Sequence, residues 1–144
     1  MAERGCDGVR VFDVRVTGRE VGWLGGRKAE GNQRMGVHIW KGESGGEEVW
    51  AGGGDGRVRM WRWDGRVDVG SGTEEHEVKV KSSEWEWDVT NDGSAVGGVG
   101  VHPSGLMVVT ASGERKAINV DDDTQEETSA EGRPMDNTVK IWLL

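Results

Sequence analysis

Short runs of alternating apolar and polar residues, interrupted by Gly and Asp, recur along this 144-residue chain. Alternation with a period of two is typical of strands with one buried face, and no apolar stripe follows the 3.6-residue period of a helix. We therefore predict an all-β chain that folds as an antiparallel meander. The expected strands cover residues 8–14, 20–24, 34–40, 48–51, 57–63, 78–81 or 84–89, 98–102, 106–111 and 138–143.

Three of these runs share one pattern, in which a polar turn leads into a strand with an aromatic residue near its end. The three are residues 7–13 (DGVRVFD), 55–61 (DGRVRMW) and 136–142 (DNTVKIW). Asp-Gly or Asp-Asn suits the left-handed turn of a tight hairpin, and the alternation then points one face inward and the basic side chains outward. We expect structural roles for the turn residues Asp55 and Asp136 and for the anchors Trp61 and Trp142.

This pattern resembles the third strand of WD-repeat blades, and matching hairpin partners precede two of the three strands, at residues 49–54 and 108–113. Blades recur about every 40–45 residues. The anchors Phe12, Trp61 and Trp142 are instead 49 and 81 positions apart, and two polar insertions, at residues 67–83 and 117–134, account for the wider gap.

The resemblance implies a partial WD-repeat β-propeller of about two and a half four-stranded antiparallel blades. Residues 5–25 would form the third and fourth strands of one blade. Residues 32–89 would form one full blade with an acidic insertion. Residues 97–144 would form the last blade, with a disordered acidic loop at 117–134.

Three short motifs, in their order and spacing, resemble the carboxy-terminal part of the telomerase Cajal body protein family. They are residues 32–34 (NQR), 98–103 (GVGVHP) and 110–115 (TASGER). The resemblance implies a non-enzymatic nuclear protein of Cajal bodies that needs no cofactor. Such a protein binds small Cajal-body RNAs and telomerase RNA, has proteins of the ribonucleoprotein as partners, helps to localise the ribonucleoprotein, and supports telomere maintenance.

Two further expectations come from the same resemblance. Other propeller blades would be needed to complete the ring, so the chain would be a truncated or partial gene product. Distant fungal members are linked to pre-mRNA splicing, which leaves the specific RNA open. The alternative is a generic WD-repeat scaffold that binds protein partners and is associated with splicing.

In well-formed WD blades, a Ser or Thr on the second strand bonds the anchoring Trp as part of a network with His and Asp. The middle segment has Ala51 at that position, so we expect no such network there. In the last segment, Thr110 or Ser112 could supply the hydroxyl, with Asp136 and Trp142 as two further members.

An alternating cationic row lies beside Trp61 and Trp63 and consists of Arg57, Arg59, Arg62 and Arg66. Such a row could contact phosphates while the indoles stack on bases. Charged side chains on the outer face of a strand also simply keep it solvated. Both interpretations stay open at this point.

Two further groups would lie at the rim of a propeller, where partners commonly bind. They are the preferred RNA or partner contacts that the resemblance implies, with ordinary turn residues as the alternative: Asn32, Gln33, Arg34, Arg115 and Lys116.

Charge and composition narrow the range of functions. The first 66 residues carry 12 Lys or Arg against 10 Asp or Glu, whereas residues 67–144 carry 6 against 16, and the net charge of −8 counts against nonspecific binding to nucleic acid. Eight Trp with one Phe and no Tyr must provide most of the aromatic packing. Cys6 is the single cysteine, so we expect no internal disulfide and no thiolate metal cluster. No apolar run approaches the roughly 18 residues that span a bilayer, so we expect no membrane partner.

Other motifs point to little chemistry. The Gly-rich stretch 52–56 could suggest a phosphate cradle, but no Lys-Ser or Lys-Thr follows, and a hairpin turn explains it better. The acidic stretch 121–127 does not match the spacing of a calcium-binding loop. His38, His76 and His102 are scattered, so we expect neither a metal site nor a catalytic site.

Overall fold

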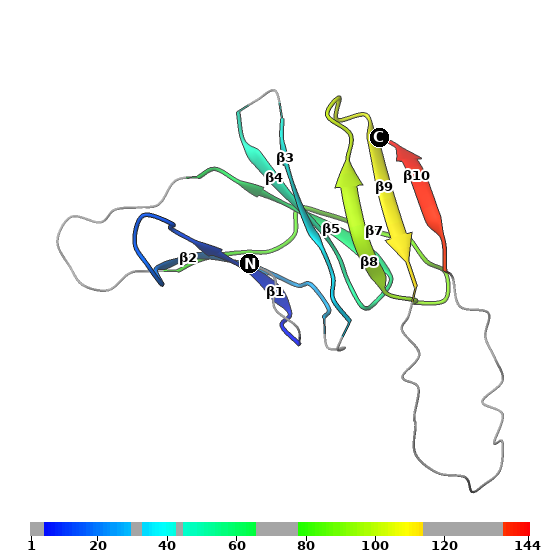
Figure 1. The fold of residues 1–144 in the computed structure, drawn as a ribbon, viewed down its shortest axis with the longest axis horizontal. Coiled ribbons are helices and arrows are strands. Elements are labelled where there is room, and N and C mark those ends of the chain that lie inside the picture. The colour runs from blue at the N-terminus through cyan, green and yellow to red at the C-terminus, as the bar shows by residue number, and fades with distance from the viewer. Residues whose placement is uncertain (1–4, 30–32, 43–44, 66–77, 114–136) are drawn as a thin grey trace, which may run out of the picture.

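The computed structural model describes residues 5–29, 33–42, 45–65, 78–113 and 137–144. These residues form ten strands in three sheets and contain no helix, which confirms the all-β prediction for the described part of the chain (Figure 1). The described residues therefore include no helix that could cross a membrane.

The central sheet has four antiparallel strands in the order β3-β4-β5-β7. Their bounds are β3 Val37–Lys41, β4 Glu47–Gly52, β5 Arg57–Trp63 and β7 Trp85–Asp88. The third sheet is also antiparallel, in the order β10-β9-β8, with β8 Val96–Val101, β9 Met107–Ser112 and β10 Val139–Leu143. Within the described residues, β10 and β8 are therefore the edge strands of that sheet.

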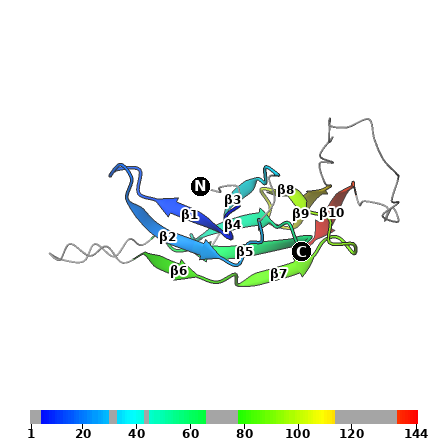
Figure 2. The ribbon, with the colours of Figure 1, turned by 90° about the horizontal axis from the view of Figure 1, so that it is seen from below.

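The first sheet departs from a pure meander. It contains β1 Gly8–Phe12, β2 Glu20–Gly25 and β6 Lys79–Lys81 in the order β1-β2-β6. β1 and β2 are antiparallel, but β6 runs parallel to β2, so the prediction of an entirely antiparallel chain was wrong at this strand. Figure 2 shows β6 beside β2 and β7 beside β5, because the chain leaves the first sheet and continues into the central one.

The middle strands of the central sheet, β4 and β5, are mostly buried on both faces, because successive side chains of a strand point to opposite sides and both sides are covered. Val49, Ala51, Trp61 and Trp63 pack with residues of β1 and β2 in one core cluster. Trp50, Val58 and Met60 pack with residues of β8 and β9 in a second cluster. The three sheets therefore stack face to face, with the central sheet between the other two.

The strand predictions were close, with three differences. Residues 78–81 and 84–89 were alternatives, yet the structure has a strand in each, in different sheets. β3 begins at Val37 and not at residue 34, because β4 offers partners only up to the turn that follows Gly52 and Gly36 donates instead to the carbonyl of Gly97 in the third sheet.

The third difference concerns the first repeated pattern. Gly56 has a positive φ of 76°, as the Asp-Gly turn predicts, but Gly8 has no positive φ and lies inside β1. A Cβ atom at Gly8 would stand 2.5 Å from Cζ2 of Trp23. Glycine is needed at this position for the close approach of the indole and not for a turn.

Candidate functional site

The arginines of β5 are paired with acidic residues of β7 by strand register. Arg57 lies opposite Asp88 and Arg59 opposite Glu86. Arg57 Nε donates to Asp88 Oδ1 at 2.7 Å, and Arg59 Nε donates to Glu86 Oε2 at 3.1 Å. Opposite charges at directly opposed positions stabilise an antiparallel pair. The matching alternation of acids in residues 84–88 was the signal in the sequence for this pairing.

Arg59 does not face solvent as the alternation predicted, since the residue is 5% exposed. Its Nη1 and Nη2 donate to the two carboxylate oxygens of Asp55 at 3.1 and 2.6 Å, which forms a bidentate pair. The prediction of outward basic side chains was wrong here because β5 is an inner strand covered on both faces. The buried guanidinium is instead paired with the carboxylates of Asp55 and Glu86.

The charges of this cluster reinforce one another. The hydrogen bond from Arg59 to Asp55 raises the pKa of Arg59, and the hydrogen bond to Asp88 raises the pKa of Arg57. Burial acts to raise the pKa of Asp55, but the hydrogen bonds and charge of Arg59 outweigh burial, so that pKa lies below its ordinary value. Arg57 and Arg59 are therefore engaged in holding β5 to β7 and to the turn at Asp55. Arg66, the last member of the predicted row, lies outside the described residues.

The predicted rim residues present a different arrangement. Gln33 Nε2 donates to the carbonyl of Gly113 at 2.7 Å, across 80 positions of sequence. Arg34 follows directly and is exposed. Arg115 and Lys116 follow Gly113 in sequence by two and three positions but, like Asn32, lie outside the described residues. The structure thus joins the chain near 33 to the chain at 113, where the two predicted groups of contacts begin.

The two Trp anchors satisfy their indole N–H groups in different ways. Trp142 Nε1 donates to Thr110 Oγ1 at 2.9 Å, which selects Thr110 over Ser112 as the hydroxyl partner. Trp61 is fully buried and donates to the carbonyl of Gly25 at 3.1 Å in the neighbouring sheet. The missing hydroxyl at Ala51 is therefore replaced by a backbone acceptor. Asp136, predicted as a structural partner, lies outside the described residues.

A cavity of about 430 Å³, which was not predicted from the sequence, lies between the central and third sheets. Its lining includes three indoles and two carboxylates, from Trp40, Trp50, Trp85, Glu48 and Glu84. We call this cavity the Trp-Glu pocket. A clue to it lay in the sequence, since Trp and Glu alternate in residues 84–87, but the strand pairing that gathers the side chains spans almost fifty positions.

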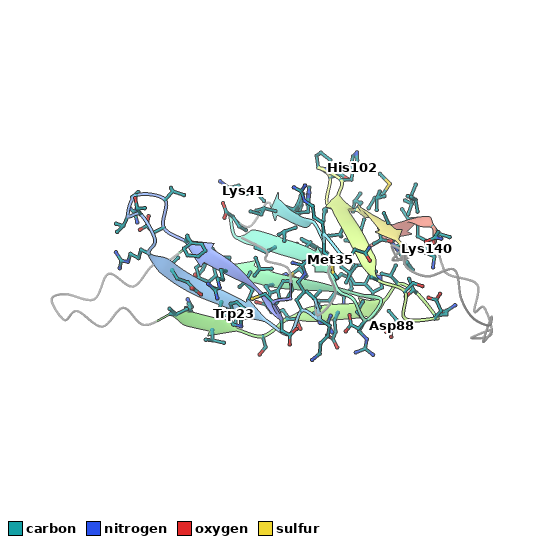
Figure 3. The ribbon with its side chains drawn as sticks, turned by 60° about the horizontal axis from the view of Figure 1, so that its bottom comes forward. Trp23, Met35, Lys41, Asp88, His102 and Lys140 are labelled. Carbon is teal, nitrogen blue, oxygen red and sulfur yellow. The ribbon has the colours of Figure 1, made fainter. Side chains whose placement is uncertain are left out.

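The remaining predicted features have structural roles. The Gly-rich stretch is the turn between β4 and β5, in which Gly53 N donates to the carbonyl of Arg57 at 2.8 Å. His102 forms the β8–β9 turn by accepting at its carbonyl from Gly105 N at 2.8 Å. Figure 3 shows His102 near the upper edge of the molecule in this view and Asp88 near the lower edge. Among the described residues, no group of three His, Cys, Asp or Glu side chains could hold a metal ion.

A second feature that the sequence did not predict is the burial of Arg27, which is 1% exposed. Its Nε donates to the carbonyl of Gly52 at 2.9 Å, while its Nη2 finds no hydrogen-bond partner. Burial lowers the pKa of this guanidinium. Arg27 therefore links the segment after β2 to the last residue of β4 and lies buried between the first and central sheets.

No protein-family model matches the chain, and no curated protein matches it either.

Proposed function

We propose that the chain is part of a WD-repeat β-propeller of the telomerase Cajal body type, and that it is a non-enzymatic nuclear protein that binds a small RNA. The rim at Gln33 and Arg34, together with Arg115 and Lys116, would form the contact. The observation that carries the proposal is the Gln33 to Gly113 hydrogen bond, because it brings together two segments that the motifs had separately indicated.

The propeller part of the proposal is supported by the way the sheets stack. Three antiparallel-rich sheets, each buried against the next, are the arrangement expected of neighbouring blades. The Trp142 to Thr110 hydrogen bond supports it further, since a WD blade uses its Trp and a second-strand hydroxyl in this way.

Of the basic residues Arg34, Arg57 and Arg59, only Arg34 is suited to the proposed contact. Arg57 and Arg59 are paired with acids, so we leave them out of the contact. Arg34 is exposed, and none of the ion pairs recorded between described residues includes it. An exposed guanidinium that is not engaged in an ion pair among the described residues suits a phosphate contact.

The test is a filter-binding titration of the full 144-residue chain with a stem-loop RNA of the small Cajal-body class. We expect Arg34→Gln to weaken binding several-fold and to lower the salt dependence by about one phosphate contact. Arg57→Gln is the matched control and should leave the affinity unchanged. An affinity that changes neither with salt concentration nor with the sequence of the RNA terminal loop would refute the proposal. Equal losses of affinity in the two variants would refute it as well.

A second function, a scaffold for protein partners, is favoured by the exposed face of the third sheet. Val139, Ile141 and Leu143 alternate along β10 and are all exposed. Apolar groups gathered in this way mark interaction surfaces. Capture of protein partners from a nuclear extract that persists after RNase treatment, and is lost in Ile141→Lys, would support this function over RNA binding.

A further inference from the structure

The Trp-Glu pocket is built from two adjacent rows of side chains on one face of the central sheet. One row runs across three strands, because Trp40 lies opposite Glu48 and Glu48 lies opposite Arg62. The next row runs from Trp50 to Met60 and on to Trp85. Directly opposed residues in an antiparallel sheet share a face. The β8–β9 turn at Gly105 closes the pocket from the other side.

The floor of the pocket is apolar and buried. Trp50 is 2% exposed and Met60 is buried. The Trp50 and Trp85 rings are 6.0 Å apart between centroids and nearly perpendicular, at 80°. Because Trp85 is 45% exposed, these rings form a corner with a buried wall and an accessible one.

Trp40 is held in place from the third sheet. Its Nε1 donates to the carbonyl of Pro103 at 3.4 Å. Gly105 has a φ of +72°, and a Cβ there would stand 2.6 Å from Cζ2 of Trp40. The turn therefore packs directly on the indole, so a third aromatic wall exists before any ligand arrives.

The carboxylates add negative charge to these aromatic walls. Glu48 accepts from Trp50 Nε1 at 3.1 Å, which orients one of its oxygens into the apolar floor. Arg62 Nε is 3.6 Å from Glu48 Oε1 and 3.9 Å from Glu84 Oε2. Both distances exceed hydrogen-bond length, so the carboxylates attract Arg62 without being bonded by it. Two acids against one base leave the pocket lining acidic.

We propose that the Trp-Glu pocket binds the methylated ammonium of a lysine side chain from a protein partner. Indole faces attract cations through their quadrupole, and alkylated ammonium groups suit such cages because their methyl groups pack on the rings. At Glu48 a guanidinium fits less well, since bidentate pairing needs two free oxygens and Trp50 already bonds one of them. The volume of about 430 Å³ lies within the range of about 300–1,000 Å³ that is usual for ligand sites.

This inference does not depend on RNA binding at the rim. It predicts a second kind of recognition, of a cationic peptide, on a different part of the molecule. Arg62 has a particular role in it: as an internal cation beside the same carboxylates, it competes with the ligand.

The experiment is an NMR titration of the full chain in which the indole N–H signals are followed. The probes are N-acetyl-trimethyllysine amide and its neutral isostere, in which a tert-butyl group replaces the trimethylammonium. We expect the charged probe to shift the Trp85 and Trp50 signals saturably, and to bind at least fivefold more tightly than the neutral one. Equal binding of the two probes, or no saturable shift, would overturn the proposal.

Three variants sharpen the test. Trp85→Leu should weaken binding of the charged probe about tenfold, whereas Trp23→Leu, a Trp of the first sheet outside the lining, should leave it unchanged. Arg62→Gln should tighten binding about threefold, because it removes the internal competitor. A purely structural role for the cluster predicts no gain, so unchanged or weaker binding in Arg62→Gln contradicts the proposal even if Trp85→Leu unfolds.

Discussion

At the scale of single residues, the acidic partners of each arginine decide whether that arginine is available to bind a ligand. The sequence shows an arginine row, yet Arg59 is buried against Asp55 and Glu86, and Arg57 is bonded to Asp88. Removing one partner of a buried pair leaves an unpaired charge, which is costly. This cost applies to Arg59, whereas the pair of Arg57 with Asp88 is solvent-exposed and contributes little to stability. Because both arginines are paired with acids, the exposed Arg34 is the better candidate for a ligand contact.

A second charged residue makes stability depend on pH. The pKa of Asp13 is lowered from 3.8 to about 2, mainly because the Arg15 side chain donates hydrogen bonds to it at 2.9 and 2.8 Å. The backbone N–H of Arg15 adds a third hydrogen bond at 3.0 Å. The unfolded chain thus takes up this proton at a higher pH than the folded chain does. The stabilisation is present above pH 3.8 and is lost as the pH falls towards 2.

We predict that Asp13→Asn lowers the melting temperature at pH 6 and has progressively less effect between pH 4 and pH 2. Circular dichroism melts of both proteins at several pH values measure this. Asp7→Asn, at an exposed position before β1, serves as the control and should show no such trend. A gap between Asp13→Asn and the original chain that persists at pH 2 would contradict the explanation.

At the scale of elements, the sequence predicted the strands well because each carries its own signal. Alternation and Asp-Gly turns located β4 and β5 within a residue or two. The parallel pairing of β6 with β2 could not be predicted, since it joins segments almost sixty positions apart and three residues carry too little pattern. The Trp-Glu pocket was missed for the same reason, because it depends on strand register as well as on composition.

Turn glycines offer a matched test of how tightly these elements are joined. Gly56 and Gly18 have nearly equal φ angles of 76° and 78°. A Cβ at Gly18 would meet nothing within 4 Å, whereas a Cβ at Gly56 would collide with Thr90 Oγ1 and stand 3.2 Å from the Cα of Gly93. The carbonyl of Gly56 also accepts from Val89 N at 2.9 Å.

We predict that Gly18→Ala costs about 1 kcal/mol of unfolding free energy through backbone strain, and that Gly56→Ala costs at least about 2 kcal/mol more. Urea denaturation of the two variants measures the difference. The comparison isolates the steric contact, because both substitutions impose the same left-handed conformation on alanine. Equal losses would mean that the chain around Thr90 moves aside without cost.

At the scale of the whole molecule, the two faces of the stack differ. Strands β4 and β5 of the central sheet are covered on both sides, whereas β10, an edge strand among the described residues of the third sheet, presents an exposed apolar row of Val139, Ile141 and Leu143. Edge strands with exposed apolar side chains tend to pair with other chains. Proposals for RNA at the rim, a methylated lysine in the pocket and a protein on β10 concern three separate surfaces of one scaffold.

The β10 row leads to a prediction about association in solution. Sedimentation velocity of the full chain should show species that grow with protein concentration, because apolar patches on an open edge self-associate. Ile141→Lys should reduce this association. It should change the free energy of unfolding by no more than about 0.5 kcal/mol, since Ile141 is 69% exposed and contributes little to the core. Val80→Lys is the control: Val80 is as exposed, at 71%, but lies on β6. If both lysine variants reduce association equally, added charge is the cause and not the β10 row; if the original chain stays monomeric at all concentrations, the row is not an association surface.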